Sequence, residues 1–225
     1  TVFHNYIGTI DTLYLSYSIN GAALVNETWT GNLAMNDSLT FDFTQKYNVP
    51  KGRLYTVFVQ VTLPPSYNTL ALQNDTATFE IGLPMAGIYT VGGSNPDFVN
   101  LNEANYNYYK IHTSGACTFN IRPGLDSLFS IYEYQDGNPL TFRSANGNPN
   151  AVQIKIMDVY DSYNINFKNV TLYPRTDNGA LYNYKGAEFI GGQFSIDSCI
   201  IRGLNDPAYR NGLTFVHSDS VSVTN

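Results

Sequence analysis

In the C-terminal half of the chain, the residues that could take part in catalysis are those with acidic or basic side chains. Hydrolysis of a polysaccharide requires two or three carboxylates that converge on one groove, whereas elimination requires an arginine or lysine base, often beside acidic calcium ligands. The available acids and bases are Asp158, Asp161, Asp177, Asp197, Asp206, Lys155, Lys168, Arg175 and Arg202. They are scattered along the chain, and no Asn-Thr-Asp, Asp-Asp, Gly-His-Gly or Arg-Ile-Lys set occurs. We therefore predict a protein without catalytic residues.

Histidines and cofactor motifs lead to the same prediction. His4, His112 and His217 lie in separate segments, and none has a second ligand at metal-binding spacing. The sequence contains no serine nucleophile elbow, Walker loop or dinucleotide-binding fingerprint. It therefore predicts neither a metal site nor a cofactor.

Charge and hydropathy restrict the classes of partner. The chain has 225 residues, 18 of them acidic and 12 basic, with a net charge of −6 and a pI near 4.9. Because it also lacks a cluster of Lys and Arg, it has no electrostatic basis for binding nucleic acid or an anionic membrane. No apolar stretch approaches the roughly 18 residues that cross a bilayer, so we predict no membrane insertion.

Tyrosine is the abundant residue type that suits recognition. The chain holds 18 Tyr. Together with Asn and Ser, tyrosine forms binding surfaces of low conformational entropy, and its ring stacks on sugars. Most of these rings are expected to pack within the fold. The candidates for contact with a glycan or another cell-surface ligand are Tyr173, Tyr182, Tyr184 and Tyr209.

A repeated strand must position these residues. The segment INFKNVTL from Ile165 matches FSIDSCII from Phe194, apolar on apolar, and similar segments begin at Leu140 and Val221. A self-similar period of roughly 20 to 50 residues indicates a solenoid whose repeats bury their apolar faces against one another. Only 13% of residues are charged, and Tyr and Phe are abundant, which is typical of an all-β protein. We therefore predict a parallel β-helix in which residues 165–172 form one strand.

The repeat also assigns individual residues to neighbouring coils. An offset of 29 residues places Asp197 beside Lys168, and we predict a stacked charge pair between adjacent coils. Cys117 and Cys199 occupy positions where neighbouring coils carry Val or Leu. The favoured interpretation is two buried thiols that pack as small hydrophobes, and the alternative is a bridge between them.

Residues 1–82 are predicted to form a separate β module. The turn at Asn20-Gly21 between two alternating segments is a strong hairpin signal. The predicted strands cover residues 12–19, 23–29, 38–43, 54–61 and 76–81. Short strands at this spacing indicate an immunoglobulin-like β-sandwich, with Trp29 in its core.

A short helix is predicted as a cap on the first coil, near residues 98–115. Asn100 followed by Glu103 has the form of an N-terminal capping pair, and one or two helical turns can follow from residue 104 to residue 111. The spacing favours a helix that places Tyr106, Tyr109 and Ile111 on one side.

Two segments resemble parts of large secreted proteins of Bacteroidota. LSYSINGAALVNETWTG at residues 15–31, with TFDF at residues 40–43, is similar to their immunoglobulin-like repeats. GIYTVGGSNPDF at residues 87–98, followed by CTFNIRPG and PLTFRS, resembles the opening of their β-helix domains. The resemblance implies a right-handed, pectin-lyase-like helix and export by the type IX machinery to the extracellular space or the cell surface. It also implies that the module lacks its first strand, and we expect the native protein to continue past Asn225.

The chain contains several tripeptides in which Asp is followed by Ser or Thr and then by an apolar residue. They resemble acceptor sites for exported O-glycans in the same bacteria. The predicted acceptors are Thr12, Ser38, Thr76, Ser127 and Ser220.

The sequence thus predicts an all-β chain. An immunoglobulin-like β-sandwich at residues 1–82 precedes the N-terminal coils of a right-handed parallel β-helix at residues 83–225. The favoured function is that of a non-catalytic adhesin or stalk segment of a secreted or cell-surface protein, which presents a Tyr/Asn-rich surface to glycans. One alternative is a polysaccharide lyase or hydrolase with its catalytic coils beyond residue 225. Another is a structural subunit of an extracellular filament or secretion complex.

Overall fold

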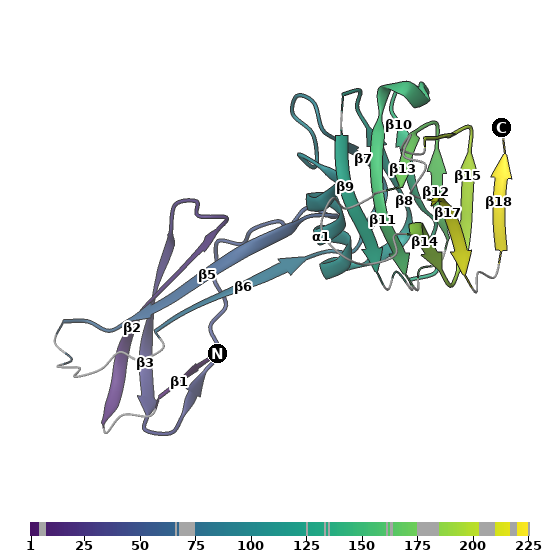
Figure 1. The fold of residues 1–225 in the computed structure, drawn as a ribbon. Helices are drawn as coiled ribbons and strands as arrows, with labels where there is room; N and C mark the ends of the chain where they lie inside the picture. The colour runs from purple at the N-terminus through teal and green to yellow at the C-terminus, as the bar shows by residue number, and fades with distance from the viewer. Residues whose placement is uncertain are drawn as a thin grey trace. The chain divides into compact units, whose positions relative to one another are not determined.

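The computed structural model divides the chain into two compact units (Figure 1). It describes residues 1–4, 8–65, 67, 75–124, 126–132, 134, 136–160, 162, 164–174, 185–202, 210–216 and 220–224. The first unit comprises Thr1–Pro50 and Leu54–Leu83, and the second comprises Lys51–Arg53 and Pro84–Asn225. Each unit is described separately below.

The first unit consists of antiparallel strands. A four-stranded sheet has the order β3-β2-β5-β6, and β1 pairs with β4 in a second, two-stranded sheet. The strands are β1 (Val2–Phe3), β2 (Thr9–Ile19), β3 (Val25–Ala34), β4 (Ser38–Leu39), β5 (Leu54–Thr62) and β6 (Thr76–Gly82). The predicted strand at residues 38–43 is therefore shorter than expected, because only its first two residues pair with another strand.

The predicted hairpin joins β2 to β3. Asn20 and Gly21 both adopt positive φ, 50° and 70°, which matches the twist of the flanking strands. The buried cluster of this unit lies on one face of the sheet, and its members are Ile10, Leu13, Leu15 and Leu33. Trp29 packs against this cluster but is only half-buried, because β3 is an edge strand of the four-stranded sheet.

The second unit is a β-solenoid of about three turns. One six-stranded parallel sheet has the order β18-β15-β12-β10-β8-β7, and a second has the order β16-β13-β11-β14-β17, with β9 also paired to β11. The strands of the first sheet are β7 (Met85–Val91), β8 (Thr113–Ile121), β10 (Leu140–Ser144), β12 (Ile165–Lys168), β15 (Gln193–Asp197) and β18 (Ser220–Thr224). Those of the second are β9 (Asp126–Tyr132), β11 (Gln153–Tyr160), β13 (Thr171–Pro174), β14 (Lys185–Ile190), β16 (Ile200–Ile201) and β17 (Arg210–Val216).

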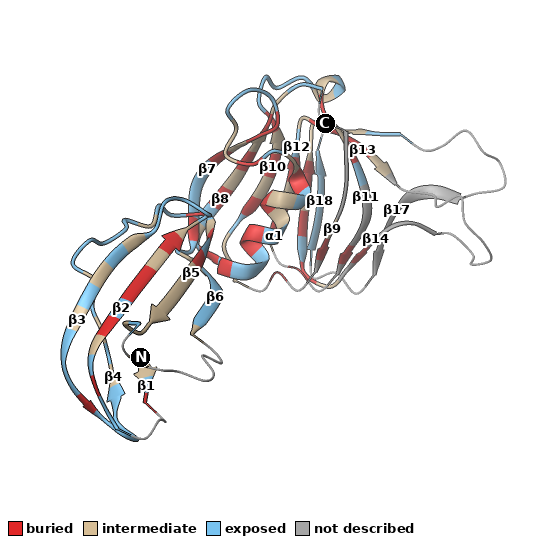
Figure 2. Cartoon of the chain, turned by 90° about the vertical axis from the view of Figure 1, so that its left-hand side faces the viewer, coloured by how far each residue is buried: buried red, intermediate tan, exposed pale blue. Residues whose placement is uncertain are grey.

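The strand register confirms the repeat found in the sequence. Leu140 pairs with Ile165, Ile165 with Phe194, and Phe194 with Val221. Residues two positions further along form a second inward-facing column, which includes Phe119, Phe142, Phe167 and Ile196. Buried residues alternate with less buried ones along β8 and β10 (Figure 2). The alternation fills the interior of the solenoid with mainly apolar residues and leaves most of the polar residues outside, with Thr113 and Ser144 as buried exceptions.

One prediction about the coil is wrong in detail. Residues 165–172 form two strands, β12 and β13, because the chain turns a corner at Asn169, whose φ is 52°. Ser198 makes the equivalent corner one coil later, also with a φ of 52°. Asparagine tolerates this left-handed conformation better than most residues. The apolar residues change spacing at this corner, from two between Ile165 and Phe167 to three between Phe167 and Val170, because two polar residues stand in succession. The sequence therefore does mark the change of direction that the prediction of one strand overlooked.

Helix α1 (Leu101–Ile111) confirms the predicted capping pair. The side chain of Asn100 accepts a hydrogen bond from the amide of Glu103 at 2.9 Å, and the Glu103 carboxylate accepts one from the amide of Val99 at 2.6 Å. The residues predicted to share one side of the helix are separated by burial, since Tyr106 and Tyr109 are exposed whereas Ile111 is buried together with Tyr108. The helix contacts β7 and β9, and that contact selects the face.

Both cysteine thiols are free. Cys117 is fully buried beside Leu140, and burial raises the pKa of its thiol to about 12. Cys199 is half-buried, and burial also raises the pKa of its thiol. Both groups therefore remain protonated at neutral pH and pack as small hydrophobes.

The predicted charge pair between adjacent coils is present on the outer face of the first sheet. Lys168 Nζ lies 2.8 Å from Asp197 Oδ2, and the strand register places the two residues side by side. The pKa of Asp197 is lowered by the hydrogen bond from Lys168 and further by those from Ser198 and Thr224. A carboxyl group whose pKa is lowered by folding stabilises the fold above its unfolded pKa and loses that contribution as the pH falls through the folded value.

Replacing Lys168 with methionine is expected to raise the pKa of Asp197 toward its ordinary value, because the largest stabilising contact is removed. The hydrogen bonds from Ser198 and Thr224 should keep the pKa of Asp197 below that value. A carbon-13 NMR titration of the Asp197 carboxyl group measures the shift. An unchanged midpoint would contradict the ion pair.

Candidate functional site

Three successive coils place a basic residue, a tyrosine and a second basic residue in line on the outer face of the second sheet. Tyr173 in β13 pairs with Lys155 in β11. On the other side, Leu172 pairs with Ile201, and the amide of Arg202 donates a hydrogen bond to the carbonyl of Leu172, so the next residues, Tyr173 and Arg202, lie beside each other. Leu172 and its partner Ile154 are fully buried at the inward positions, so the next residues, Tyr173 and Lys155, point outward. Arg202 is exposed beside Tyr173.

The guanidinium group of Arg202 is held by two neutral groups. Nη1 donates to the hydroxyl of Tyr173 at 3.3 Å, and Nη2 donates to Oδ1 of Asn150 at 2.9 Å. Asn150 lies in the short 3-10 helix η1 (Pro149–Ala151), which is fixed to β13 by a hydrogen bond from the Thr171 hydroxyl to the Pro149 carbonyl at 2.7 Å. We call Asn150, Lys155, Tyr173 and Arg202 the Tyr173 surface.

The Tyr173 surface combines three kinds of recognition chemistry. A half-buried tyrosine ring can stack on the apolar face of a sugar. The hydroxyl of Tyr173 accepts a hydrogen bond from Arg202 and keeps its own hydrogen for donation. The exposed side chains of Lys155 and Arg202 add hydrogen-bond donors, and that of Asn150 adds an amide group. Such a set binds and orients a polar ligand, and it contains no carboxylate that could act as an acid or a base.

The sequence predicted only part of this surface. Tyr173 is a predicted ligand-binding residue, whereas the sequence offers Lys155 and Arg202 only as possible catalytic bases and assigns no role to Asn150. The signal for Arg202 is its offset of 29 residues from Tyr173, which is the offset between Lys168 and Asp197. No sequence signal indicates Asn150, because it approaches Arg202 from two coils earlier.

The structure says less about the other residues that were predicted as ligand-binding or glycosylation sites. Tyr182, Tyr184 and Tyr209 lie outside the described residues. Among the predicted O-glycan acceptors, Ser38, Thr76 and Ser220 are exposed, Thr12 is half-buried within β2, and Ser127 belongs to β9. Their modification stays a prediction.

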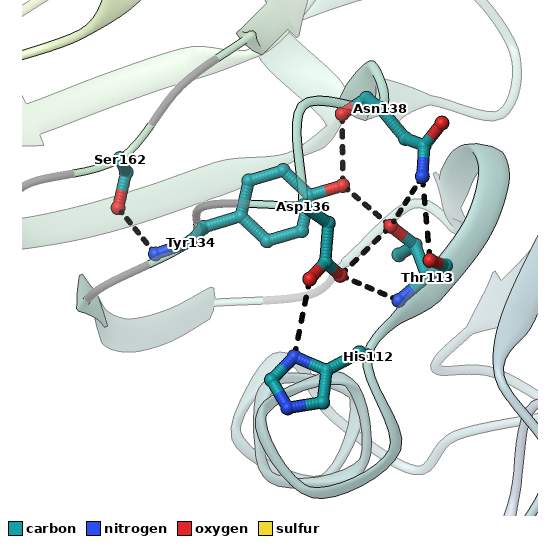
Figure 3. A network of polar contacts seen from close by, with 6 residues as sticks. All are labelled: His112, Thr113, Tyr134, Asp136, Asn138 and Ser162. Carbon is teal, nitrogen blue, oxygen red and sulfur yellow. Dashed lines mark hydrogen bonds and ion pairs between the residues drawn. The ribbon is translucent and has the colours of Figure 1, made fainter.

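A polar network lies where α1 ends and β8 begins (Figure 3). One oxygen of Asp136 accepts hydrogen bonds from the amide of Thr113 at 2.6 Å and from its hydroxyl at 2.9 Å. The hydroxyl of Tyr134 lies 2.9 Å from that of Thr113 and donates to the carbonyl of Asn138 at 2.8 Å. Tyr134 is buried, and burial raises the pKa of its phenol to about 12, so it remains neutral.

With His112, this network contains the imidazole, carboxylate and hydroxyl groups of a catalytic triad, but they are not arranged in the order that a triad requires. Its Nδ1 lies 3.2 Å from Oδ1 of Asp136, and its side chain is exposed. In a nucleophilic triad the imidazole lies between the carboxylate and the hydroxyl. Here the carboxylate lies between the imidazole of His112 and the hydroxyl of Thr113 (Figure 3), so the imidazole is not placed to take the Thr113 proton. The arrangement fastens the end of α1 to the next coil.

Comparisons with known proteins identify no relative. No protein-family model, curated protein or solved structure matches the chain. Within the described part of the chain, no group of three or more His, Cys, Asp or Glu could hold a metal ion. Within the same residues, no helix has the length and apolar character needed to cross a membrane.

Proposed function

We propose that this chain is a non-catalytic segment of a secreted or surface-displayed protein, in which the β-solenoid presents a glycan-binding surface. The observation that carries the proposal is the Tyr173 surface, where an outward tyrosine is combined with an arginine held in place by Tyr173 and Asn150. Solenoids commonly carry recognition on their outer faces, and a ring fixed by rigid strands loses little entropy when it binds.

The first unit is interpreted as an immunoglobulin-like module that separates or supports the solenoid. Its antiparallel sheets and the Asn20-Gly21 hairpin support this interpretation. The resemblance to secreted proteins of Bacteroidota supports a role as a stalk or adhesin and export by the type IX machinery. Tandem β modules with a repeat domain extend a binding surface away from the point of attachment.

Binding of the 225-residue chain to a glycan array tests the proposal. We expect at least one class of glycan to bind, and we expect Tyr173→Ala to weaken that binding by about 5- to 10-fold through loss of the ring contact. Tyr109→Ala is the matched control, because Tyr109 is an exposed tyrosine on α1. An array without any bound glycan, or equal weakening by both variants, would contradict the proposal.

A further inference from the structure

We infer that the ligand of the Tyr173 surface is an anionic saccharide, one that carries carboxylate or sulfate groups. This inference rests on the proposed function and specifies the chemical class of the glycan. A ring such as that of Tyr173 stacks on neutral and charged sugars alike, so the ring alone does not choose between them. The choice comes from the guanidinium group of Arg202 beside it.

The guanidinium group of Arg202 is oriented but not neutralised by the described residues. A guanidinium has five N–H donors in a fixed plane, and the two contacts to Tyr173 and Asn150 use two of them. Both acceptors are uncharged. Lys168 on the opposite sheet shows the contrasting case, since its ammonium group pairs with Asp197 at 2.8 Å.

An exposed and oriented guanidinium suits an anion for two reasons. Hydrogen bonds between arginine and a carboxylate or sulfate are charge-assisted and stronger than those to a neutral hydroxyl. The side chain is also held in place by Tyr173 and Asn150 before the ligand arrives, so less rotamer entropy is lost on binding.

Lys155 lies in the same column. It is exposed and pairs with Tyr173 on the side opposite to Arg202. Strands in a sheet are about 4.8 Å apart, so Lys155 and Arg202 stem from positions roughly 10 Å apart with the tyrosine between them. An extended saccharide that lies along the solenoid axis can therefore stack on Tyr173 while an acidic group binds Arg202.

The charge distribution of the chain permits an anionic ligand at this unit. The first unit contains one basic residue, Lys46, against six acidic residues. The solenoid unit contains 11 Lys and Arg against 12 Asp and Glu. Most of the net charge of −6 thus belongs to the first unit, and the solenoid is close to neutral. The overall acidity that argues against nucleic acid does not repel an anion from the Tyr173 surface.

The test measures binding of the 225-residue chain to three oligosaccharide probes of equal length by isothermal titration calorimetry. The first probe is a polyuronate, the second is the same oligosaccharide after reduction of its carboxyl groups to alcohols, and the third is a sulfated neutral oligosaccharide. We expect the polyuronate or the sulfated probe to bind about 10- to 100-fold more tightly than the reduced probe. That binding should weaken as salt is raised from low to physiological concentration.

Variants assign the effect to the Tyr173 surface. Arg202→Gln is expected to weaken binding of the anionic probe by about 10-fold or more, and Arg202→Lys by less, because lysine keeps the charge but loses the planar fork. Lys110→Gln, an equal change of charge on α1, is the control and should have no effect. Circular dichroism and thermal unfolding verify that each variant is folded.

The outcomes separate the inference from the function it rests on. If the reduced probe binds as tightly as the anionic probes and Arg202→Gln changes nothing, the inference is overturned while glycan binding stands. If none of the probes binds and the glycan array is also blank, the proposed function fails. Preference for the polyuronate or for the sulfated probe decides which acidic group the surface accepts.

Discussion

Replacing Phe142 with alanine is expected to lower the free energy of unfolding of the solenoid unit by about 3–5 kcal/mol. Phe142 is 1% exposed and lies between two other rings of the interior column. Its ring centroid is 5.3 Å from that of Phe119 and 5.5 Å from that of Phe167, and the latter pair is stacked at 20°. Truncation leaves a cavity between two coils and removes both ring contacts, and in a solenoid each coil is stabilised mainly by its neighbours.

Urea unfolding followed by two signals measures this effect. Far-UV circular dichroism reports both units, whereas tryptophan fluorescence reports the first unit, because Trp29 is the single tryptophan of the chain. We expect Phe142→Ala to shift the dichroism transition of the solenoid. Phe142→Leu should cost less, about 1–2 kcal/mol, since it conserves most of the buried volume.

Phe79→Ala is the matched control for Phe142→Ala. Phe79 lies in the edge strand β6 and is half exposed, so its truncation should change the stability of the first unit by well under the cost at Phe142. If Phe142→Ala proved as mild as Phe79→Ala, the column of stacked rings would not hold adjacent coils together.

Replacing Gly52 with alanine is expected to produce the second-largest loss of stability. Gly52 adopts a φ of +78°, and a Cβ atom there would overlap the hydroxyl group and ring of Tyr89. The backbone conformation costs a non-glycine residue about 1–2 kcal/mol. Displacing the buried Tyr89 ring, which packs against Phe98 and Phe119, adds about 1–3 kcal/mol of overpacking.

Gly87→Ala separates the two costs at Gly52. Gly87 also has a positive φ, +99°, but no atom lies within 4 Å of the position its Cβ would occupy. Alanine there should cost only the backbone contribution. The same urea experiment compares the two variants, and equal losses would show that the contact between Gly52 and Tyr89 adds nothing.

The sequence was sufficient to predict how the coils stack. The strand partners of Ile165, Phe194 and Val221 follow from a simple alignment, because a solenoid repeats one apolar pattern and each inward residue must meet its equivalent in the next coil. The ion pair of Lys168 and Asp197 follows from the same offset. Residues equivalent in the repeat are neighbours in space, so a local pattern predicts contacts between distant residues.

Two features were not predicted, namely the corner within residues 165–172 and the face of the helix that packs. The corner at Asn169 coincides with a change of apolar spacing from two to three residues between Phe167 and Val170, so the sequence contains a signal for it that the prediction of one strand did not use. Tyr106, Tyr108 and Tyr109 are close together in the sequence, and only the contacts of α1 with β7 and β9 determine that Tyr108 is the buried one. The packed face of the helix depends on surroundings that the local segment does not encode.

The sequence was sufficient to predict some members of the Tyr173 surface but not all of its contacts. Tyr173 was selected for its residue type, and its position beside Lys155 and Arg202 follows from register once the coils are known. The contact of Arg202 with Asn150 is different, because η1 reaches across from two coils earlier and its position depends on the hydrogen bond between Thr171 and Pro149.

By itself the sequence determined the all-β composition, the repeat and the register, because apolar residues that must be buried together recur at a fixed spacing. Only the tertiary structure decided that Arg202 is held by Tyr173 and Asn150, and that the Asp136 carboxylate separates His112 from Thr113. The physical reason is that a polar contact depends on the direction of individual side chains at corners and turns. Periodicity constrains which side of the coil a residue faces, and it leaves that direction open.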